Sequence, residues 1–211
     1  MFNTSEAAAI YRIKNRVKEY WSAATFHRGL RQLEFDRLQP DTIVIAGGCF
    51  TSFLHDEKPK LMGFSIMQAE LVKPKDIDIF VLDNLEAIKT AMEHLHDGAE
   101  SHTQDDDPQY DKSASKLNAN IVNVVNRKVD GVKYQWIFTR YKTRQELINH
   151  FDFVHTKVSY DPITDKLYLS PETYHAIMNK ELIKNGNNII AVWRFDKFTK
   201  KGWKIPDRIT A

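Results

Sequence analysis

Asp76 and Asp78 are separated by one residue in the apolar run DIDIFV, residues 76–81. Side chains of a strand alternate between its two faces, so both carboxylates would share one face and the intervening isoleucines the other. Two carboxylates this close repel one another unless a cation lies between them, and Mg²⁺ prefers oxygen ligands of this kind. The spacing indicates a metal site, or alternatively a strand edge whose aspartates face solvent or pair with Lys73 and Lys75.

A second candidate feature lies upstream, where Gly47 and Gly48 end an apolar strand and precede Thr51 and Ser52 at the start of an expected helix. Glycine allows close approach of the backbone to a ligand, and free N–H groups at a helix N-terminus favour phosphate. The alternative is a tight strand-to-helix turn without a ligand. From the residues alone, both interpretations stay open.

The segments IAGGCFTS and KDIDIFV together resemble the nucleotidyltransferase superfamily of the DNA polymerase beta type. That family has a strand, a Gly-Gly or Gly-Ser turn, a helix, and a strand carrying Asp-x-Asp. Its two aspartates hold divalent metals, a third carboxylate on a nearby strand completes the site, and the glycine turn holds nucleotide phosphates. The resemblance implies that Asp76, Asp78 and Asp152 are the catalytic metal ligands.

The resemblance covers roughly residues 40–160 and includes one departure from the family pattern. Gly48 and Asp76 are 28 positions apart, which implies an insertion at 56–75. The segments YQWIFTRY and FDF are also similar to uncharacterised nucleotidyltransferase-like proteins of bacteriophages.

The activity implied by the resemblance is transfer of a nucleoside monophosphate from an NTP such as ATP to a hydroxyl acceptor, with release of pyrophosphate. Mg²⁺ or Mn²⁺ would be the cofactor, and Gly47, Gly48, Thr51 and Ser52 would hold the phosphates. The acceptor stays open between RNA, a small molecule and a protein. The alternative is a catalytically inactive nucleotidyltransferase fold that binds a nucleotide, a nucleic acid or a host protein.

Near the C-terminus, Arg194, Lys197 and Lys201 fall at i, i+3 and i+7 of an expected helix and would form one basic face. The opposite side would carry Ile189, Val192 and Phe195. The basic face is either solvated or contacts a triphosphate or a nucleic-acid backbone. Arg194 and Lys197 are therefore candidate nucleotide-binding residues.

Other residues that could do chemistry favour structural roles. Cys49 is the single cysteine, which excludes an internal disulfide framework, and it has no histidine partner nearby in sequence, so packing is expected. His94 and His96 are i, i+2 on an expected helix and cannot face one ligand, which favours solvated or capping histidines. The acidic run at 105–107 lacks calcium-loop spacing and favours a solvated loop.

The pattern of apolar residues, caps and turns predicts an α/β (α+β) fold with a mixed sheet of the nucleotidyltransferase type, flanking helices and a small helical C-terminal part. Strands are expected within 41–46, 76–83, 118–141 and 152–170, with a hairpin at 129–131 and a turn at Asp161-Pro162. Helices are expected over 5–22, 24–36, 49–54, 84–98, 143–151, 170–183 and 187–202, and an exposed loop over 99–116. We expect N-terminal helices over 1–39, a core over 40–169 and a C-terminal part over 170–211.

The composition sets broad limits on the function. The 211 residues carry a formal net charge of +2, so any basic surface must be local. No run approaches the roughly 18 apolar residues of a membrane helix, and the N-terminus has no apolar secretory core. We expect a cytoplasmic protein without a membrane partner, in the host cytoplasm if it is phage-encoded.

Overall fold

The computed structural model describes residues 2–25, 32–55, 73–96 and 119–206. The expected loop at 99–116, the helix stop at Gly98, and all but the last three residues of the expected insertion at 56–75 lie outside the described residues. The three-part division of the chain stays a prediction.

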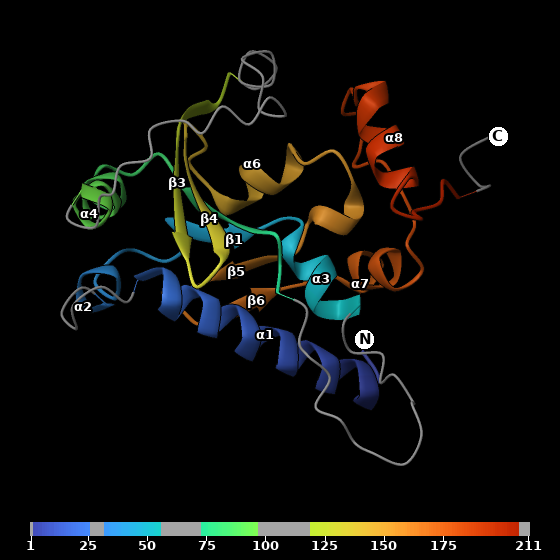
Figure 1. The fold of residues 1–211 in the computed structure, drawn as a ribbon, viewed down its shortest axis with the longest axis horizontal. Coiled ribbons are helices and arrows are strands. Elements are labelled where there is room, and N and C mark those ends of the chain that lie inside the picture. Colours follow the sequence, from blue (N-terminus) through green and yellow to red (C-terminus); the bar gives the residue numbers. More distant parts are fainter. Residues whose placement is uncertain (1, 26–31, 56–72, 97–118, 207–211) are drawn as a thin grey trace.

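Six strands form one mixed sheet in the order β3-β4-β2-β1-β5-β6 (Figure 1). Their bounds are β1 Ile43–Ala46, β2 Asp76–Val81, β3 Ile121–Val129, β4 Val132–Thr139, β5 Ser159–Asp161 and β6 Lys166–Tyr168. β2 and β4 run parallel, with Asp78 opposite Gln135, and the other neighbouring pairs are antiparallel. The predicted α/β class with a mixed sheet is confirmed.

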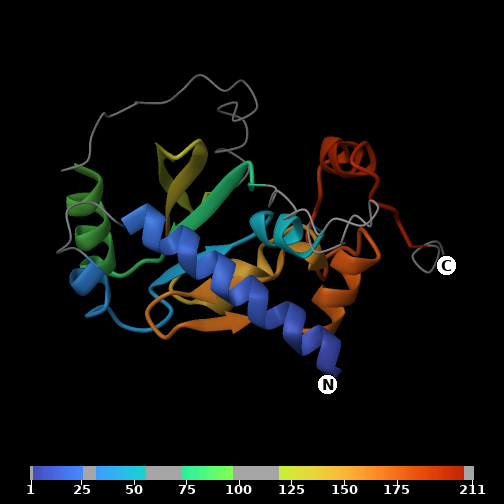
Figure 2. The same cartoon turned by 60° about the horizontal axis from the view of Figure 1, so that its bottom comes forward.

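The larger core lies on the sheet face that α1, Thr4–Thr25, crosses (Figure 2). Ile13, Val17 and Trp21 recur along one side of α1 and pack with strand residues such as Ile77 and Trp136. Four further helices contribute to this core: α2 Gln32–Phe35, α3 Cys49–His55, α4 Leu85–His96 and α7 Pro171–Met178. One face of the central strands is therefore wholly apolar.

The opposite face of the sheet is apolar at one end and polar at the other. At the apolar end, Leu147 of α6, Arg144–Asn149, packs with Val44, Phe80 and Ile137 of the strands. Residues further along the same strands on this face are Asp78, Asp76 and their neighbours. This polar end is the part of the sheet that the apolar packing leaves available for chemistry.

Local sequence signals account for several helix and turn boundaries. The Asn84 side chain accepts from Ala87 N at the start of α4, and Ser170 accepts from Thr173 N at the start of α7, as a cap must. Asp130 and Gly131 both have positive φ, 49° and 82°, the geometry of a two-residue hairpin turn. These predictions are confirmed.

The C-terminal helix α8, Val192–Thr199, begins later than the expected helix over 187–202. Asn185 and Asn188 donate side-chain hydrogen bonds to the carbonyls of Asn149 and Phe151, which holds the segment before α8 out of helical geometry. Ile189 is 98% exposed and lies outside the helix, so its expected place on the side of the helix opposite the basic residues was wrong. Phe195 and Phe198 instead pack against a small cluster of Phe153, Leu182 and Trp203.

Candidate nucleotide and metal site

Asp76 and Asp78 lie on one face of β2, as their spacing predicts, while Ile77 and Ile79 are fully buried on the other. β2 is an inner strand between β1 and β4, so its carboxylates do not lie on an open sheet edge. Lys73, expected as an alternative ion-pair partner, donates to the carbonyl of Asp130 instead.

Asp78 has the least favourable electrostatic surroundings of the pair. Its Oδ1 atom is buried and has no hydrogen-bond partner among the described residues. Burial raises the pKa of Asp78 to about 7, with the Asp76 carboxylate adding to the rise and Lys197, Arg194 and Lys133 opposing it. A buried carboxylate oxygen without a partner is what a cation or an added hydrogen-bond donor would satisfy.

The Gly47–Gly48 turn lies directly against this carboxylate. Gly47 has φ +95°, which disfavours any side chain, and a Cβ built there would stand 3.4 Å from Asp78 Oδ2. A Cβ at Gly48 would meet nothing within 4 Å. The structure thus brings together two features that are 28 positions apart in sequence, and Gly48 borders open space beside the carboxylate.

Thr51 and Ser52, the other candidate phosphate-binding residues, lie in the first turn of α3 and are half-buried. The Thr51 hydroxyl donates to the carbonyl of Gly48 at 2.6 Å. Cys49, which follows Gly48 at the start of α3, is buried in the large core, which agrees with the expected packing role. Burial, and then the nearby carboxylates Asp78 and Asp76, raise the pKa of the Cys49 thiol, so it is a poor nucleophile.

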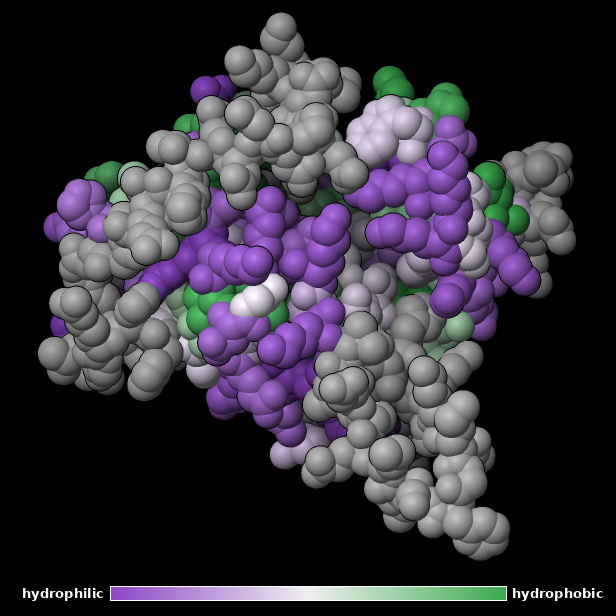
Figure 3. Space-filling model, viewed as in Figure 1, coloured by the Kyte–Doolittle hydropathy of each residue, from purple (hydrophilic) through white to green (hydrophobic). Residues whose placement is uncertain are grey.

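The basic residues of α8 approach the acidic pair from a different part of the chain. Lys197 lies in a cluster of charges: its pKa is lowered by burial and by Arg194, Lys201 and Lys75, while Asp76 raises it. In Figure 3, hydrophilic side chains of α8 and of the sheet flank a depression between them. Arg194 and Lys197 therefore lie near enough to the acidic pair for their charges to lower the pKa of Asp78.

Asp152 does not join the acidic pair. It was expected on a strand, but Phe153 makes only an isolated bridge with Lys184 and residues Val154–Thr156 form a 3-10 turn. The Asp152 carboxylate accepts from Arg194 Nε at 2.5 Å. A short apolar run fits a strand or a buried turn equally well, so the strand predicted at Asp152 was wrong. Within the described ranges, no three His, Cys, Asp or Glu side chains lie together as a metal-binding group.

The strand positions beside Asp78 were missed by the sequence interpretation. Lys133 and Gln135 of β4 are in register with Asp76 and Asp78, so their side chains share the same sheet face. Gln135 is buried and donates to Asn126 Oδ1 at 3.1 Å. An amide therefore lies next to Asp78 on the neighbouring strand. Only the parallel β2–β4 register reveals this.

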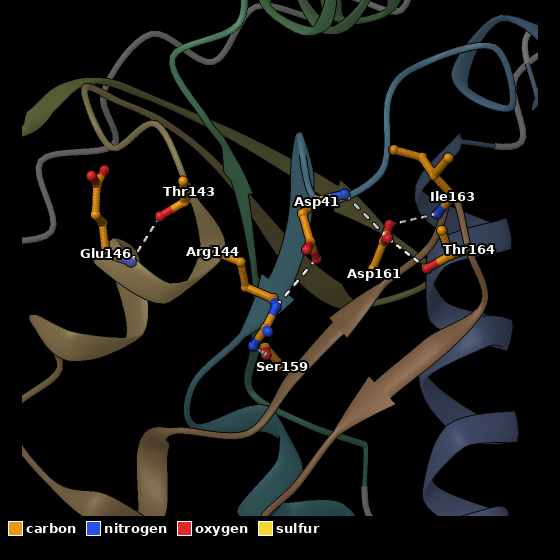
Figure 4. Close-up of polar contacts among 8 residues, drawn as sticks. All are labelled: Asp41, Thr143, Arg144, Glu146, Ser159, Asp161, Ile163 and Thr164. Atoms are coloured by element: carbon orange, nitrogen blue, oxygen red, sulfur yellow. Dashed lines mark hydrogen bonds and ion pairs between the residues drawn. The ribbon is translucent and has the colours of Figure 1, made fainter.

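Arg144 at the start of α6 was also missed, and Figure 4 shows it pointing from α6 toward the sheet. Its Nε donates to Asp41 at 3.2 Å, its Nη1 to Ser159 Oγ at 3.5 Å, and its guanidinium lies 3.5 Å from the Tyr168 ring centroid. Asp161 in the same view accepts from Asp41 N and from the Thr164 hydroxyl. This network anchors α6 and the β5–β6 hairpin beside the site.

Two histidines have structural positions. His94, expected to be solvated or to cap a helix, is buried beside Trp136 with its Nε2 3.0 Å from the carbonyl of Ala24, so that expectation was wrong. His94 lies on the buried side of the amphipathic helix α4. His155 is buried in the C-terminal cluster, 3.9 Å from the Trp203 ring centroid, and neither ring nitrogen has a partner among the described residues. Burial, and then Arg194, lower the pKa of His155 to about 3.

The solved structures that are similar to this chain include two of CCA-adding enzymes. The apo form I of a CCA-adding enzyme has a TM-score of 0.48 and 14% identity, covering 83% of this chain and 34% of that one. The Thermotoga maritima CCA-adding enzyme complexed with tRNA_CCA has a TM-score of 0.41 and 15% identity, covering 78% and 35%. The chain thus spans about a third of each, and at TM-scores below 0.5 neither likeness supports an inference. No curated protein matches the chain.

Of the described helices, none has the length and hydrophobicity needed for a membrane span.

One family model matches the sequence over residues 12–180, a range that includes the glycine turn, the acidic pair and Asp152, and that ends before α8. The match covers well over half of the chain. The chain therefore belongs to the Gad2 family, described as Gabija anti-defense 2 family protein.

Proposed function

We propose that this protein counteracts the Gabija defence as a metal-dependent nucleotidyltransferase. The observation that carries the proposal is the Asp78 carboxylate, which lies against the Gly47–Gly48 turn. One of its oxygens is buried without a hydrogen-bond partner among the described residues, and Asp76 lies beside it on the same strand face. The family description supplies the defence system. The resemblance of the two sequence segments to nucleotidyltransferases supplies the reaction.

The residues present fit a divalent cation. Asp76 and Asp78 offer only oxygen ligands, the repulsion between them is relieved by a cation, and Asp78 Oδ1 lacks any other partner in the described chain. Asp76 and Asp78 would hold Mg²⁺ or Mn²⁺. When bound, the cation would supply charge neutralisation at the phosphates and favour deprotonation of the acceptor hydroxyl.

The chain's own residues would bind and orient the NTP. The open backbone at Gly48 allows phosphate to approach the turn, where the hydroxyls of Thr51 and Ser52 are within the same helical turn. Arg194 and Lys197 would neutralise the triphosphate from the α8 side. The acceptor oxygen then bonds to the α-phosphorus and loses its proton, the bond from the α-phosphorus to the bridging oxygen breaks, and pyrophosphate leaves.

Asp152 has a different role in this proposal from the one expected. Its ion pair with Arg194 orients the guanidinium, so Asp152 is a positioning residue. A double-mutant cycle tests this with Asp152→Asn, Arg194→Gln and the double variant. If Asp152 acts only through Arg194, its loss weakens NTP binding in the wild type and has no further effect in Arg194→Gln. Equal effects of Asp152→Asn in both backgrounds would contradict the positioning role.

A second candidate function is binding of a nucleotide without transfer. The specific observation in its favour is the site composition: Gln135 occupies the position beside Asp78, and Asp152 is engaged by Arg194. Two carboxylates with a neighbouring amide suffice to bind a cation and a nucleotide. Counter-defence would then act by sequestering a nucleotide.

The two candidates are separated by incubating the purified protein with each α-labelled NTP, Mg²⁺ or Mn²⁺, and RNA, protein or small-molecule acceptors. Transfer predicts a labelled product and released pyrophosphate, both lost in Asp78→Asn and retained in Asp83→Asn, an exposed aspartate beyond the far end of β2. Metal-dependent NTP binding without any product would favour the second candidate. Absence of both binding and product would refute the nucleotide site itself.

The anti-defence role is tested in cells that carry an active Gabija system. Expression of the wild-type chain should suppress the defence, and Asp78→Asn should fail to suppress it at the same protein level. The Asp83→Asn variant is again the control. Full suppression by Asp78→Asn would mean that the acidic pair is not needed for the anti-defence effect.

A further inference from the structure

The outward side of α8 and its flanking residues is unusually apolar for a surface. Among the described residues, nine large hydrophobic side chains are exposed, and four of them lie within 189–205: Ile189, Val192, Trp193 and Ile205. Trp193 is 48% exposed, and the guanidinium carbon of Arg194 lies 5.4 Å from the centroid of its ring. A flat aromatic surface is thus available to solvent beside a cation.

The same segment forms a local basic surface on a chain whose overall charge is nearly neutral. Residues 192–206 contain one acid, Asp196, and five cations: Arg194, Lys197, Lys200, Lys201 and Lys204. The whole chain has a formal net charge of only +2, so the remainder is slightly acidic. The lowered pKa of Lys197, caused by burial and then by Arg194 and Lys201, reflects cations held close together. A polyanion would relieve this repulsion.

The basic residues connect the exposed tryptophan with the acidic pair. Arg194 and Lys197 are i, i+3 on α8, Lys201 follows two residues after the helix ends, and the charge of Asp76 acts on Lys197. Trp193 lies in the first turn of α8, next to Arg194 in sequence. The segment therefore combines an exposed aromatic ring with cations, one of which, Lys197, lies near enough to Asp76 to be affected by its charge.

We propose that α8 binds single-stranded nucleic acid and presents its terminal hydroxyl to the acidic pair as the acceptor. The acceptor step rests on the proposed nucleotidyltransferase function, in which this hydroxyl oxygen bonds to the α-phosphorus and gives its proton to water, while the bond from the α-phosphorus to the bridging oxygen breaks and pyrophosphate leaves. An unpaired base offers a free face to stack on Trp193, whereas the bases of a duplex are already stacked on one another. The five positive charges of this segment also exceed the number needed to neutralise one triphosphate.

The test is fluorescence anisotropy with a labelled 12-nucleotide single strand, as RNA and as DNA, at two salt concentrations. Trp193→Ala should weaken binding at least about fivefold, and Trp193→Phe should retain most of the affinity because a ring remains. Lys201→Ala should lower the slope of log affinity against log salt by about 0.7. Two matched controls lie elsewhere in the fold (Figure 1) and should bind as the wild type: Tyr11→Ala, an exposed aromatic on α1, and Lys89→Ala on α4.

The inference is overturned if the wild type does not bind the single strand, if a duplex of the same sequence binds as tightly, or if Trp193→Ala binds as the wild type does. In the last case the apolar side of α8 would be left for a protein partner. Titration of the wild type with Mg²⁺ and ATP tests the proposed function separately. Binding of Mg²⁺-ATP without binding of the oligonucleotide would reject this inference alone.

Discussion

At the scale of the residue, Asp78 shows a conflict between stability and function. The carboxylate is repelled by Asp76, one of its oxygens is buried without a partner among the described residues, and a Cβ built at Gly47 would lie 3.4 Å from the other. In the metal-free protein such an arrangement lowers stability, because the charged group has lost water without gaining a hydrogen bond. Residues that cost stability in this way are frequently kept for binding.

The first prediction concerns Asp78→Asn. In EDTA at pH 8, the amide removes the buried charge, so the free energy of unfolding should rise by about 1–3 kcal/mol. Addition of Mg²⁺ should raise the unfolding temperature of the wild type and leave that of the variant unchanged. Thermal unfolding with and without Mg²⁺ measures both effects. A variant that is less stable in EDTA, or that still responds to Mg²⁺, would remove Asp78 from the metal site.

His155 gives a second prediction, on pH dependence. Its pKa is about 3 in the folded protein, because of burial and then Arg194, and about 6.5 in an unfolded chain. Between these values the unfolded state binds the extra proton, so stability is complete above pH 6.5 and is lost as the pH falls toward 3. From pH 7 to pH 5 the loss from this residue is about 2 kcal/mol.

His155→Leu should abolish this part of the acid sensitivity, because the buried side chain then stays neutral in both states. Denaturant unfolding at pH 7 and pH 5 measures the difference, and His175→Leu on α7 is the control because His175 is exposed. The same loss of stability between pH 7 and pH 5 in His155→Leu and in the wild type would show that another group causes the acid sensitivity.

At the scale of the element, the two glycines of the turn between β1 and α3 differ: Gly47 has a positive φ, and Gly48 has open space beside it. Gly47→Ala forces a side chain into φ +95° beside Asp78 and should cost about 1–2 kcal/mol of stability. Gly48→Ala meets no atom within 4 Å and should change stability by less than about 0.5 kcal/mol. Yet a methyl group there would occupy the proposed phosphate position and should weaken NTP binding about tenfold or more.

Chemical unfolding and NTP titration of both variants check this prediction. The informative result is a stable Gly48→Ala protein that binds NTP poorly. Wild-type affinity in Gly48→Ala would place the phosphates elsewhere and return this turn to a purely structural role.

At the scale of the whole molecule, the core is divided unequally. α1, α3, α4 and α7 share the large core with the sheet, whereas α8 packs through Phe195 and Phe198 onto the small cluster around Phe153 and Trp203. No residue of α8 is fully buried. Segments with few buried apolar contacts open at lower free energy than the core.

Amide hydrogen exchange should therefore be faster in α8 than in β2 and β4, by a free-energy difference of a few kcal/mol. Addition of Mg²⁺ and NTP should slow exchange in α8, because Arg194 and Lys197 would then contact the phosphates. Protection of α1 should not change. Equal protection of α8 and the central strands without ligand would contradict the division of the core.

The sequence by itself determined the features that depend on neighbours along the chain. Period-two alternation placed Asp76 and Asp78 on one strand face, and the side chains of Asn84 and Ser170 started their helices. The Asp130-Gly131 pair formed the predicted hairpin turn. Each of these features depends on local dihedral preferences and on hydrogen bonds to residues a few positions away. Such features can be predicted from a single sequence. The mixed α/β class followed from the order of these elements.

Only the tertiary structure decided which residues surround the acidic pair. Gln135 lies beside Asp78 because β2 and β4 pair in parallel. This pairing is stabilised by burial of the apolar face that the two strands share. Asp152 faces Arg194 because Asn185 and Asn188 hold the chain before α8 against the end of α6. Long-range pairing of this kind depends on the summed packing of distant segments, and no local pattern encodes it.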